Sequence, residues 1–249
     1  MPNGIVSAKI GRMNQETWTA VDHYIADVLH LTDDALESAL KESDTAGLPA
    51  IAVSVPQGKL LNQLAQLCHA RRILEIGTLG GYSTIWMARA LAPDGDMITL
   101  EIDPKHAQVA RANLERAGLG NRVDVREGPA IELLPKIAAE KKAPFDLIFI
   151  DADKPSIPDY FKWSLELSKP GTVIVIDNVV REGAVIDAAS EDASVKGVRR
   201  LNEMLAAEPR VSATILQTVG TKGYDGFAVV LVREQVFTGS DSRPALRQS

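Results

Sequence analysis

The sequence predicts an α/β fold: a doubly wound sheet of seven strands, mostly parallel with an antiparallel last strand, that follows a set of N-terminal helices. From about position 71, short apolar runs alternate with helical stretches, a pattern typical of a parallel sheet with crossover helices. Only a short, glycine-containing connection joins the last two runs, which indicates an antiparallel hairpin because a parallel return needs about a dozen residues. We therefore expect a single domain over 1–249.

Residues 1–70 are predicted to form a helical N-terminal extension of this domain. Apolar side chains recur there at three- and four-residue spacing, as they do on one face of a helix. The last of these helices is expected to begin near Pro56, because proline suits the first helical turn. The segment therefore precedes the sheet and adds no strand to it.

The core of the domain, residues 71–233, contains the predicted strands and their crossover helices. Pro104 suits a helix start, Gly118 suits a helix end, and a further helix is predicted over 194–207. The apolar runs that predict strands are 73–76, 97–102, 123–125, 147–150, 173–176, 211–216 and 227–232. Residues 238–249 are rich in Ser and Arg, so this tail is expected to be disordered.

Composition and charge argue against several classes of function. With 27 Lys and Arg against 33 Asp and Glu, the net charge is −6, which disfavours a nucleic acid or an anionic membrane as a partner. Charged residues interrupt every apolar run before it reaches the ~18–20 residues that a membrane-spanning helix needs. The N-terminus lacks a signal-peptide pattern and Cys68 is alone. We expect a cytoplasmic protein, not bound to a membrane, that acts on a small molecule.

The segment after the first strand predicts a cofactor site, because ligands of open α/β sheets bind beyond the carboxyl ends of the strands. A nicotinamide dinucleotide site prefers glycine where Leu79 stands, so the turn suits a ligand without a pyrophosphate. Ser83 begins the next helix, where a hydroxyl and backbone N–H groups can hold a carboxylate. Glycine turns and helix-capping serines are also common without any ligand. The segment reads Glu75-Ile76-Gly77-Thr78-Leu79-Gly80-Gly81-Tyr82-Ser83.

Two further segments complete the outline of a nucleoside pocket. Glu101 ends the second strand, 24 residues beyond Gly77, about where a ribose-binding acid lies in such folds. Its carboxylate can accept hydrogen bonds from both ribose hydroxyls. The third strand is followed at the same edge of the sheet by Gly128-Pro129-Ala130. Together with the glycine turn, these positions favour a nucleoside-containing cofactor.

The next two strands end in side chains that carry oxygen. Asp151 follows the fourth strand, and Asp177 and Asn178 follow the fifth. Two carboxylates and an amide carbonyl make an all-oxygen set, which suits Mg²⁺, Ca²⁺ or Mn²⁺ and does not suit zinc. The alternative is that both aspartates are turn residues, which often terminate strands. The four histidines lack ligand spacing, and we interpret them as structural or surface groups.

Lys154, three residues beyond Asp151, is by itself a surface lysine as readily as a catalytic one. Considered together with the glycine turn, Glu101 and the acids at the strand ends, however, it makes the sequence resemble the cation-dependent O-methyltransferases of the catechol and caffeoyl-CoA O-methyltransferase type, including their bacterial relatives. The resemblance runs from about Val53 to Val232. The residues that carry it are Glu75, Gly77, Gly81-Tyr82-Ser83, Glu101, Gly128-Pro129-Ala130, Asp151-Ala152-Asp153-Lys154 and Asp177-Asn178.

The resemblance implies a Rossmann-like domain, usually a homodimer, that binds S-adenosylmethionine and a divalent cation, with Mg²⁺ the first expectation. By this resemblance, Asp151, Asp177 and Asn178 would bind the metal. Lys154 would be the catalytic base beside Asp151, and it would accept the proton of a hydroxyl on a catechol-like acceptor. The implied cofactor-binding residues are Val53 (through its backbone), Glu75, Gly77, Thr78, Gly81, Ser83, Glu101, Pro129, Ala130 and Asp151.

Other functions stay open at this stage. Some bacterial relatives methylate a hydroxylated uridine in transfer RNA, which the acidic charge balance of this chain disfavours. A non-catalytic, dimer-forming module that only binds the cofactor would have no use for the acids and the lysine described above. A nicotinamide oxidoreductase is disfavoured by Leu79. We expect a hydroxylated aromatic small molecule as acceptor, and the sequence does not specify which one.

Overall fold

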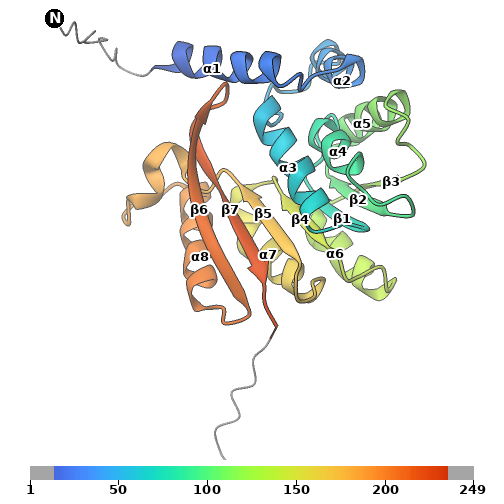
Figure 1. Ribbon diagram of the computed structural model, residues 1–249. Coiled ribbons are helices and arrows are strands. Elements are labelled where there is room, and N and C mark those ends of the chain that lie inside the picture. The colour runs from blue at the N-terminus through green and yellow to red at the C-terminus, as the bar shows by residue number, and fades with distance from the viewer. Residues whose placement is uncertain (1–13, 235–249) are drawn as a thin grey trace, which may run out of the picture.

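The computed structural model describes residues 14–234, so the predicted tail at 238–249 lies outside the described residues. Its centre is a seven-stranded sheet in the order β3-β2-β1-β4-β5-β7-β6 (Figure 1). Neighbouring strands from β3 to β5 pair in parallel, whereas β7 is antiparallel to both β5 and β6. The predicted architecture is therefore confirmed. The strands are β1 (Arg72–Ile76), β2 (Asp96–Glu101), β3 (Val123–Glu127), β4 (Leu147–Ile150), β5 (Val173–Asp177), β6 (Val211–Gly220) and β7 (Gly223–Val232).

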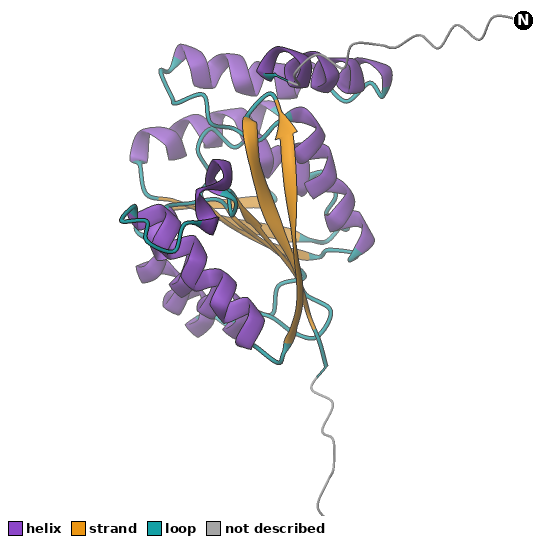
Figure 2. Cartoon of the chain, turned by 90° about the vertical axis from the view of Figure 1, so that its left-hand side faces the viewer, coloured by secondary structure: helices purple, strands orange, loops and turns teal. Residues whose placement is uncertain are grey.

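Helices cover both faces of the sheet, and two more lie across one end of it (Figures 1 and 2). One face packs against α3 (Val55–Leu67), α4 (Tyr82–Ala88) and α5 (Pro104–Arg116). The other face packs against α6 (Ala130–Ala139), α7 (Ile157–Glu166) and α8 (Ala193–Ala207). The helices α1 (Gln15–Val28) and α2 (Asp34–Thr45) lie over the end at which the parallel strands finish. Within the described range, no helix has the length and apolar character needed to cross a bilayer.

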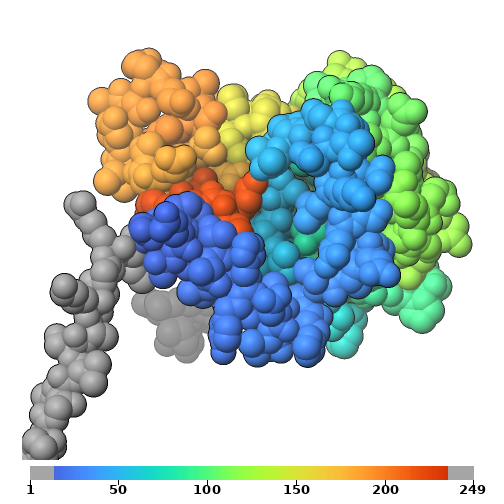
Figure 3. All heavy atoms as spheres, turned by 90° about the horizontal axis from the view of Figure 1, so that it is seen from above, coloured from blue at the N-terminus to red at the C-terminus, as the bar shows by residue number. Residues whose placement is uncertain are grey.

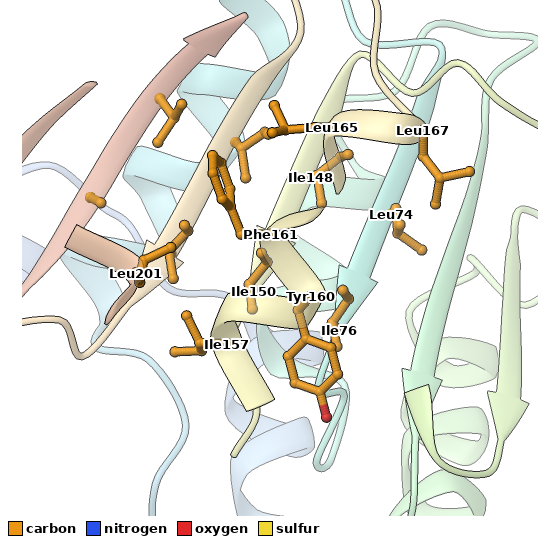
Figure 4. Close-up of a cluster of buried hydrophobic side chains, with 14 of the residues drawn as sticks. Leu74, Ile76, Ile148, Ile150, Ile157, Tyr160, Phe161, Leu165, Leu167 and Leu201 are labelled. Carbon is orange, nitrogen blue, oxygen red and sulfur yellow. The ribbon is translucent and has the colours of Figure 1, made fainter. Parts of the chain in front are cut away.

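The two faces of the sheet each bury an apolar cluster. Side chains of β4 alternate between them: Ile148 and Ile150 pack with α7, and Leu147 and Phe149 face the opposite cluster. Figure 4 shows the first cluster, in which Ile148 and Ile150 lie beside Phe161 of α7. Because both faces of β4 are buried, its sequence is a continuous apolar run instead of an alternating one. The turn after Ile150 therefore begins directly at the end of a strand that is packed on both faces.

Capping side chains and a glycine lie at the helix ends that the sequence predicted. The α3 helix begins at Val55 with proline in its first turn, and the Ser54 side chain accepts a hydrogen bond from the N–H of Gln57. Asp103 caps α5 in the same way, which satisfies N–H groups that have no partner inside the helix. Gly118, with φ of 71°, follows the end of α5 in the left-handed conformation that glycine adopts without strain.

The β6–β7 hairpin is tighter than the sequence suggested. Apolar runs predicted strands over 211–216 and 227–232 with a glycine-containing loop between them. In the structure the ladder continues until Gly220 pairs with Gly223, and only Thr221 and Lys222 remain between the strands. Backbone hydrogen bonds form regardless of side-chain polarity, so pairing extended past the point where the apolar pattern stopped. The longer hairpin carries its tip up to α1 (Figure 1).

Candidate active site

A cavity of about 760 Å³ opens at the carboxyl ends of the parallel strands. The connections that follow β1, β2, β3 and β4 form its walls, together with the segment 51–53 before α3. Figure 3 views the molecule from this end, where the N-terminal helices in blue and the hairpin tip in red gather. A cavity of this volume can enclose most of a cofactor-sized ligand.

The turn after β1 comes very close to the turn after β4. Gly77 has φ of 99°, and a Cβ atom on it would lie 2.1 Å from the backbone oxygen of Asp151. The Asp151 N–H also donates to the oxygen of Ile76 at 2.8 Å. Any side chain at position 77 would therefore push the two turns apart. Glycine here is what places the predicted cofactor turn directly against the predicted catalytic turn.

Glu101 is fixed at the cavity wall by backbone donors. Its Oε2 accepts the N–H groups of Thr78 at 3.2 Å and Leu79 at 2.7 Å, and its Oε1 accepts the N–H of Asp103 at 2.9 Å. The His106 Nδ1 lies 3.6 Å from the same Oε1. A carboxylate has about four acceptor sites in all, so the three N–H groups hold Glu101 in place and leave one site, on Oε1, for a hydroxyl group of a ligand.

Glu75 lies behind the cavity wall and is fully buried. Three hydroxyls donate to its carboxylate: Ser83 Oγ at 2.6 Å, Thr84 Oγ1 at 2.5 Å and Thr99 Oγ1 at 2.7 Å. Burial raises the pKa of Glu75 to about 7, although these three hydrogen bonds oppose the shift. Ser83 lines the cavity and Glu75 does not, so Glu75 holds the Ser83 hydroxyl from behind.

Lys154 and Asp151 form an ion pair at the other end of the cavity. Lys154 Nζ donates to Asp151 Oδ1 at 3.0 Å, and only 10% of the lysine side chain is exposed. Lys154 begins the short 3₁₀ helix η1 (Lys154–Ser156), whose first turn is closed by the Ser156 N–H donating to Asp153. On α8, a Cβ atom at Gly197 would lie 2.2 Å from the Lys154 carbonyl oxygen, so glycine allows α8 to pack directly against this segment.

Asp177 and Asn178 end the neighbouring strand, β5. Asp177 is buried, and burial together with the negative charge of Asp151 raises its pKa to about 7. Three groups lower this pKa: the charge of Lys154, a hydrogen bond from Gln57, and the N–H of Asn178. The Asn178 N–H donates to Asp177 Oδ1 at 2.8 Å. Asn178 has φ of 56°, a left-handed conformation that asparagine tolerates better than most residues. The carboxylates of Asp151 and Asp177 thus lie close enough for the charge of Asp151 to affect the pKa of Asp177.

The structure brings most of the predicted site residues to one cavity. Those that line it are Val53, Gly77, Thr78, Ser83, Glu101, Pro129, Ala130, Asp151, Lys154 and Asn178. Glu75 and Asp177 are buried just behind the wall, and Gly81, with φ of 81°, is the N-cap of α4. Among residues 14–234, no cluster of three or more His, Cys, Asp or Glu side chains has a metal-binding arrangement. The predicted metal set contains only two such side chains and an asparagine.

Sequence reasoning missed several residues of the cavity. His106 was interpreted as a structural or surface group, yet it lines the cavity beside Glu101. Its place in the first turn of α5, shortly after the end of β2, was a signal that could have found it. Tyr82 and Tyr160 also line the cavity, and the Tyr160 hydroxyl donates to Asp153 Oδ1 at 2.6 Å. Tyr82 belongs to the motif that carries the resemblance but was given no role, and Tyr160 gave no sequence signal, because helical spacing alone does not separate a core aromatic from one at a cavity wall.

Residues 29–231 match the protein family described as O-methyltransferase. The chain is 57% identical over 221 residues to a catechol O-methyltransferase of Niastella koreensis, covering 89% of this chain and 100% of that protein. It is 52% identical over 213 residues to a catechol O-methyltransferase of Mycobacterium tuberculosis, covering 86% and 95%. The crystal structure of an O-methyltransferase from Bacillus cereus in complex with SAH, S-adenosylhomocysteine, is 59% identical with a TM-score of 0.87. That likeness covers 88% of this chain and all of the other.

Proposed function

Because the chain belongs to the O-methyltransferase family, we propose that it methylates one of two neighbouring hydroxyls on a small aromatic acceptor in a divalent-cation-dependent reaction. The methyl donor of the enzyme is S-adenosylmethionine. The observation that carries the proposal is the sheltered Lys154–Asp151 pair at the end of the cavity, with Asp177 and Asn178 on the neighbouring strand. The catechol substrate in the names of the relatives is consistent with it.

In this proposal S-adenosylmethionine occupies the part of the cavity between β1, β2 and β3. Glu101 accepts a hydrogen bond from the ribose through Oε1, on which its three backbone donors leave an acceptor site free. Ser83 and the backbone of the Gly77 turn hold the methionine portion, with Glu75 keeping the Ser83 hydroxyl in place. On the remaining sides the cavity supplies contacts from Val53, Thr78, Pro129, Ala130 and Asp151, with Gly81 capping the helix behind them.

The residues around Asp177 fit a divalent cation, with Mg²⁺ the first expectation and Ca²⁺ or Mn²⁺ as alternatives. Asp151, Asp177 and the Asn178 side-chain oxygen would hold it, an all-oxygen set of the kind such cations prefer. Burial and, after it, the charge of Asp151 raise the pKa of Asp177, and this mutual effect of the two carboxylates supports the fit, because a shared cation needs them close together. A cation bound there would add positive charge beside Lys154 and the acceptor hydroxyl, which favours loss of a proton from either.

The chain's own part in the reaction centres on Lys154. The acceptor oxygen attacks the methyl carbon, the S–CH₃ bond breaks as the O–CH₃ bond forms, and the sulfonium becomes a neutral thioether. The hydroxyl proton leaves the acceptor, and Lys154 Nζ in its neutral form is the group that takes it. Asp151, 3.0 Å away, stabilises the resulting ammonium. Fixed alignment of the two reactants supplies a further part of the rate.

We also propose that the enzyme is a homodimer. The helix α1 packs beside the edge strand β6, and both elements carry exposed apolar side chains. Isologous pairing of two copies would cover a surface of this kind. The exposed apolar side chains are Val21, Tyr24 and Val28 of α1, Leu29 directly after it, and Ile215 and Val219 on one face of β6 with Leu216 on the other. A cytoplasmic location stays a prediction from the sequence.

The proposed function is tested by transfer of labelled methyl groups from S-adenosylmethionine in the presence of Mg²⁺. We expect label on catechol and none on resorcinol, whose two hydroxyls are not neighbours. Bulk transfer RNA, included as a third acceptor, should stay unlabelled. Equal labelling of catechol and resorcinol would contradict the requirement for neighbouring hydroxyls. Labelling of transfer RNA alone would replace the small-molecule acceptor with an RNA.

A further inference from the structure

The tip of the β6–β7 hairpin is held against α1 by side-chain hydrogen bonds. Thr221 donates from both its N–H and its Oγ1 to Oδ2 of Asp22 on α1, each at 2.7 Å. Gln15 of the same helix donates to the Gly220 carbonyl at 2.8 Å. Two segments about 200 residues apart in sequence thus fix the backbone of the tip. The backbone from which the next side chain extends is therefore fixed in position.

That side chain is Lys222. Its Nζ donates to the backbone oxygen of Ala50 at 2.6 Å. Ala50 directly precedes residues 51–53, which line the cavity. The lysine therefore spans from the hairpin to the segment before α3 and places an ammonium group directly beside the residues that line the cavity. Figure 3 shows the red hairpin tip next to the blue N-terminal segments at this end of the molecule.

The charge of Lys222 has no partner of its own in the described part of the chain. Its contact is a neutral carbonyl, and no carboxylate oxygen of residues 14–234 lies within 4.0 Å of its Nζ. An ammonium has three N–H donors, so two remain available. Partial burial lowers the pKa of Lys222, and the negative charges of Asp151 and Asp177 act against this shift, as they would on an ammonium group near their side of the cavity. Lys154, by contrast, is already paired with Asp151.

We propose that Lys222 is a specificity-determining residue that binds an anionic substituent, a carboxylate in the first instance, on the acceptor ring. The acceptor would present its neighbouring hydroxyls to Lys154, Asp151 and Asp177 and its carboxylate to this ammonium group. This inference rests on the proposed function, because it assigns the acceptor class of the same site. It follows that acidic catechols are preferred over neutral ones.

The test compares 3,4-dihydroxybenzoate with 3,4-dihydroxybenzamide, which has the same hydroxyls and nearly the same shape but no charge. With S-adenosylmethionine and Mg²⁺, we expect the wild-type kcat/KM to favour the benzoate by about fivefold, as for a partly exposed ion pair. Lys222→Met should remove this preference, mainly through KM for the benzoate, and Lys222→Arg should retain it. Lys196→Met serves as the matched control, because Lys196 is exposed and pairs with Glu191 away from the cavity.

The other possible results distinguish the role of Lys222 from the proposed methyl transfer itself. Equal kcat/KM for the two acceptors in the wild type, or a preference that survives in Lys222→Met, would overturn the role of Lys222 alone. Loss of S-adenosylhomocysteine binding in Lys222→Met, measured by titration calorimetry, would overturn it as well, because the lysine would then serve the cofactor. Failure of the wild type to methylate benzoate, benzamide and catechol alike would refute the proposed function itself.

Discussion

Lys154 donates a hydrogen bond from Nζ to Oδ1 of Asp151 at 3.0 Å, and both residues line the cavity from the segment that follows β4. The lysine side chain is 10% exposed and that of the aspartate 25%. A pair sheltered in this way is less screened by water and salt than a surface pair. The ammonium group is therefore held at one defined place, next to where an acceptor hydroxyl would enter.

We expect Lys154→Ala to lower kcat by about 10²- to 10⁴-fold, the usual contribution of a positioned proton acceptor, with little change in S-adenosylhomocysteine affinity. Part of the rate should return at high pH, where the acceptor ionises without help. The control is Lys162→Ala, which also removes the lysine of a Lys–Asp pair three residues apart, but on the exposed surface of α7. If kcat is unchanged in Lys154→Ala, the lysine has no part in the mechanism.

EDTA is expected to abolish methyl transfer to catechol, and added Mg²⁺ to restore it. Asp177→Asn should remove both the activity and the response to Mg²⁺, because one of the two carboxylates is lost. The variant should unfold at no lower temperature than the wild type at pH 8, since it removes a buried carboxyl whose pKa is raised to about 7. Calorimetry thus separates loss of function from loss of fold. Full activity in EDTA would refute the dependence on a cation.

Glu101→Gln is expected to raise the Kd for S-adenosylhomocysteine by about ten- to a hundredfold, the usual value of hydrogen bonds to a charged group. The control is Glu127→Gln, because Glu127 is the neighbour of Glu101 in the β2–β3 register but pairs with Arg111 outside the cavity. Titration calorimetry measures both. An equal Kd for the Glu101 variant and the wild type would show that the ribose hydroxyls are bound elsewhere.

Glu75 should make the free energy of unfolding depend on pH. Its pKa rises from an ordinary 4.5 in the unfolded chain to about 7 in the folded protein. Between these values the unfolded chain has released a proton that the folded protein still holds, so stability falls as pH rises through this window. The fall attributable to this group is about 3 kcal/mol. Urea unfolding of the wild type and Glu75→Gln at pH 5 and 8 should show it as a smaller pH-dependent loss in the variant, and parallel losses would contradict it.

The double variant Tyr24→Glu with Leu216→Glu is expected to convert the proposed dimer into a monomer, because it places one charge among the exposed apolar side chains of each element, α1 and β6. Leu67→Glu is the matched control, since Leu67 is equally apolar and 75% exposed but lies at the end of α3. Sedimentation velocity distinguishes the two species. A wild-type protein that sediments as a monomer would refute the dimer directly.

Much of this site could be read from the sequence, because it follows from strand order. Asp151 and Asp177 come directly after two apolar runs, and neighbouring parallel strands bring their carboxyl ends together; the register pairs Ile150 with Ile176. The same reasoning found Glu101 at the β2 end and the glycine turn after β1. Apolar periodicity is a local property of the chain, so it predicts strands, helices and what stands at their ends.

The surroundings of Glu75 could not be predicted from apolar periodicity. Its position before the glycine turn predicted a place near the cofactor, but the alternation of β1 points it to the face shared with Ile73, beneath α4. There it meets Thr99, its register partner on β2, and the two hydroxyls of Ser83 and Thr84. The sequence contains all four residues, yet only the packed sheet decides that they share one buried network.

The sequence by itself determined the order of strands and helices and the chemical groups at the strand ends, because both depend on neighbours along the chain. Only the tertiary structure decided that Lys222 reaches Ala50, 172 residues away, and that Gly77 touches the Asp151 backbone. It also decided that burial, together with the charge of Asp151, raises the pKa of Asp177. Contacts and electrostatic effects of this kind depend on distances in space, and these are set when helices and sheet pack to exclude water.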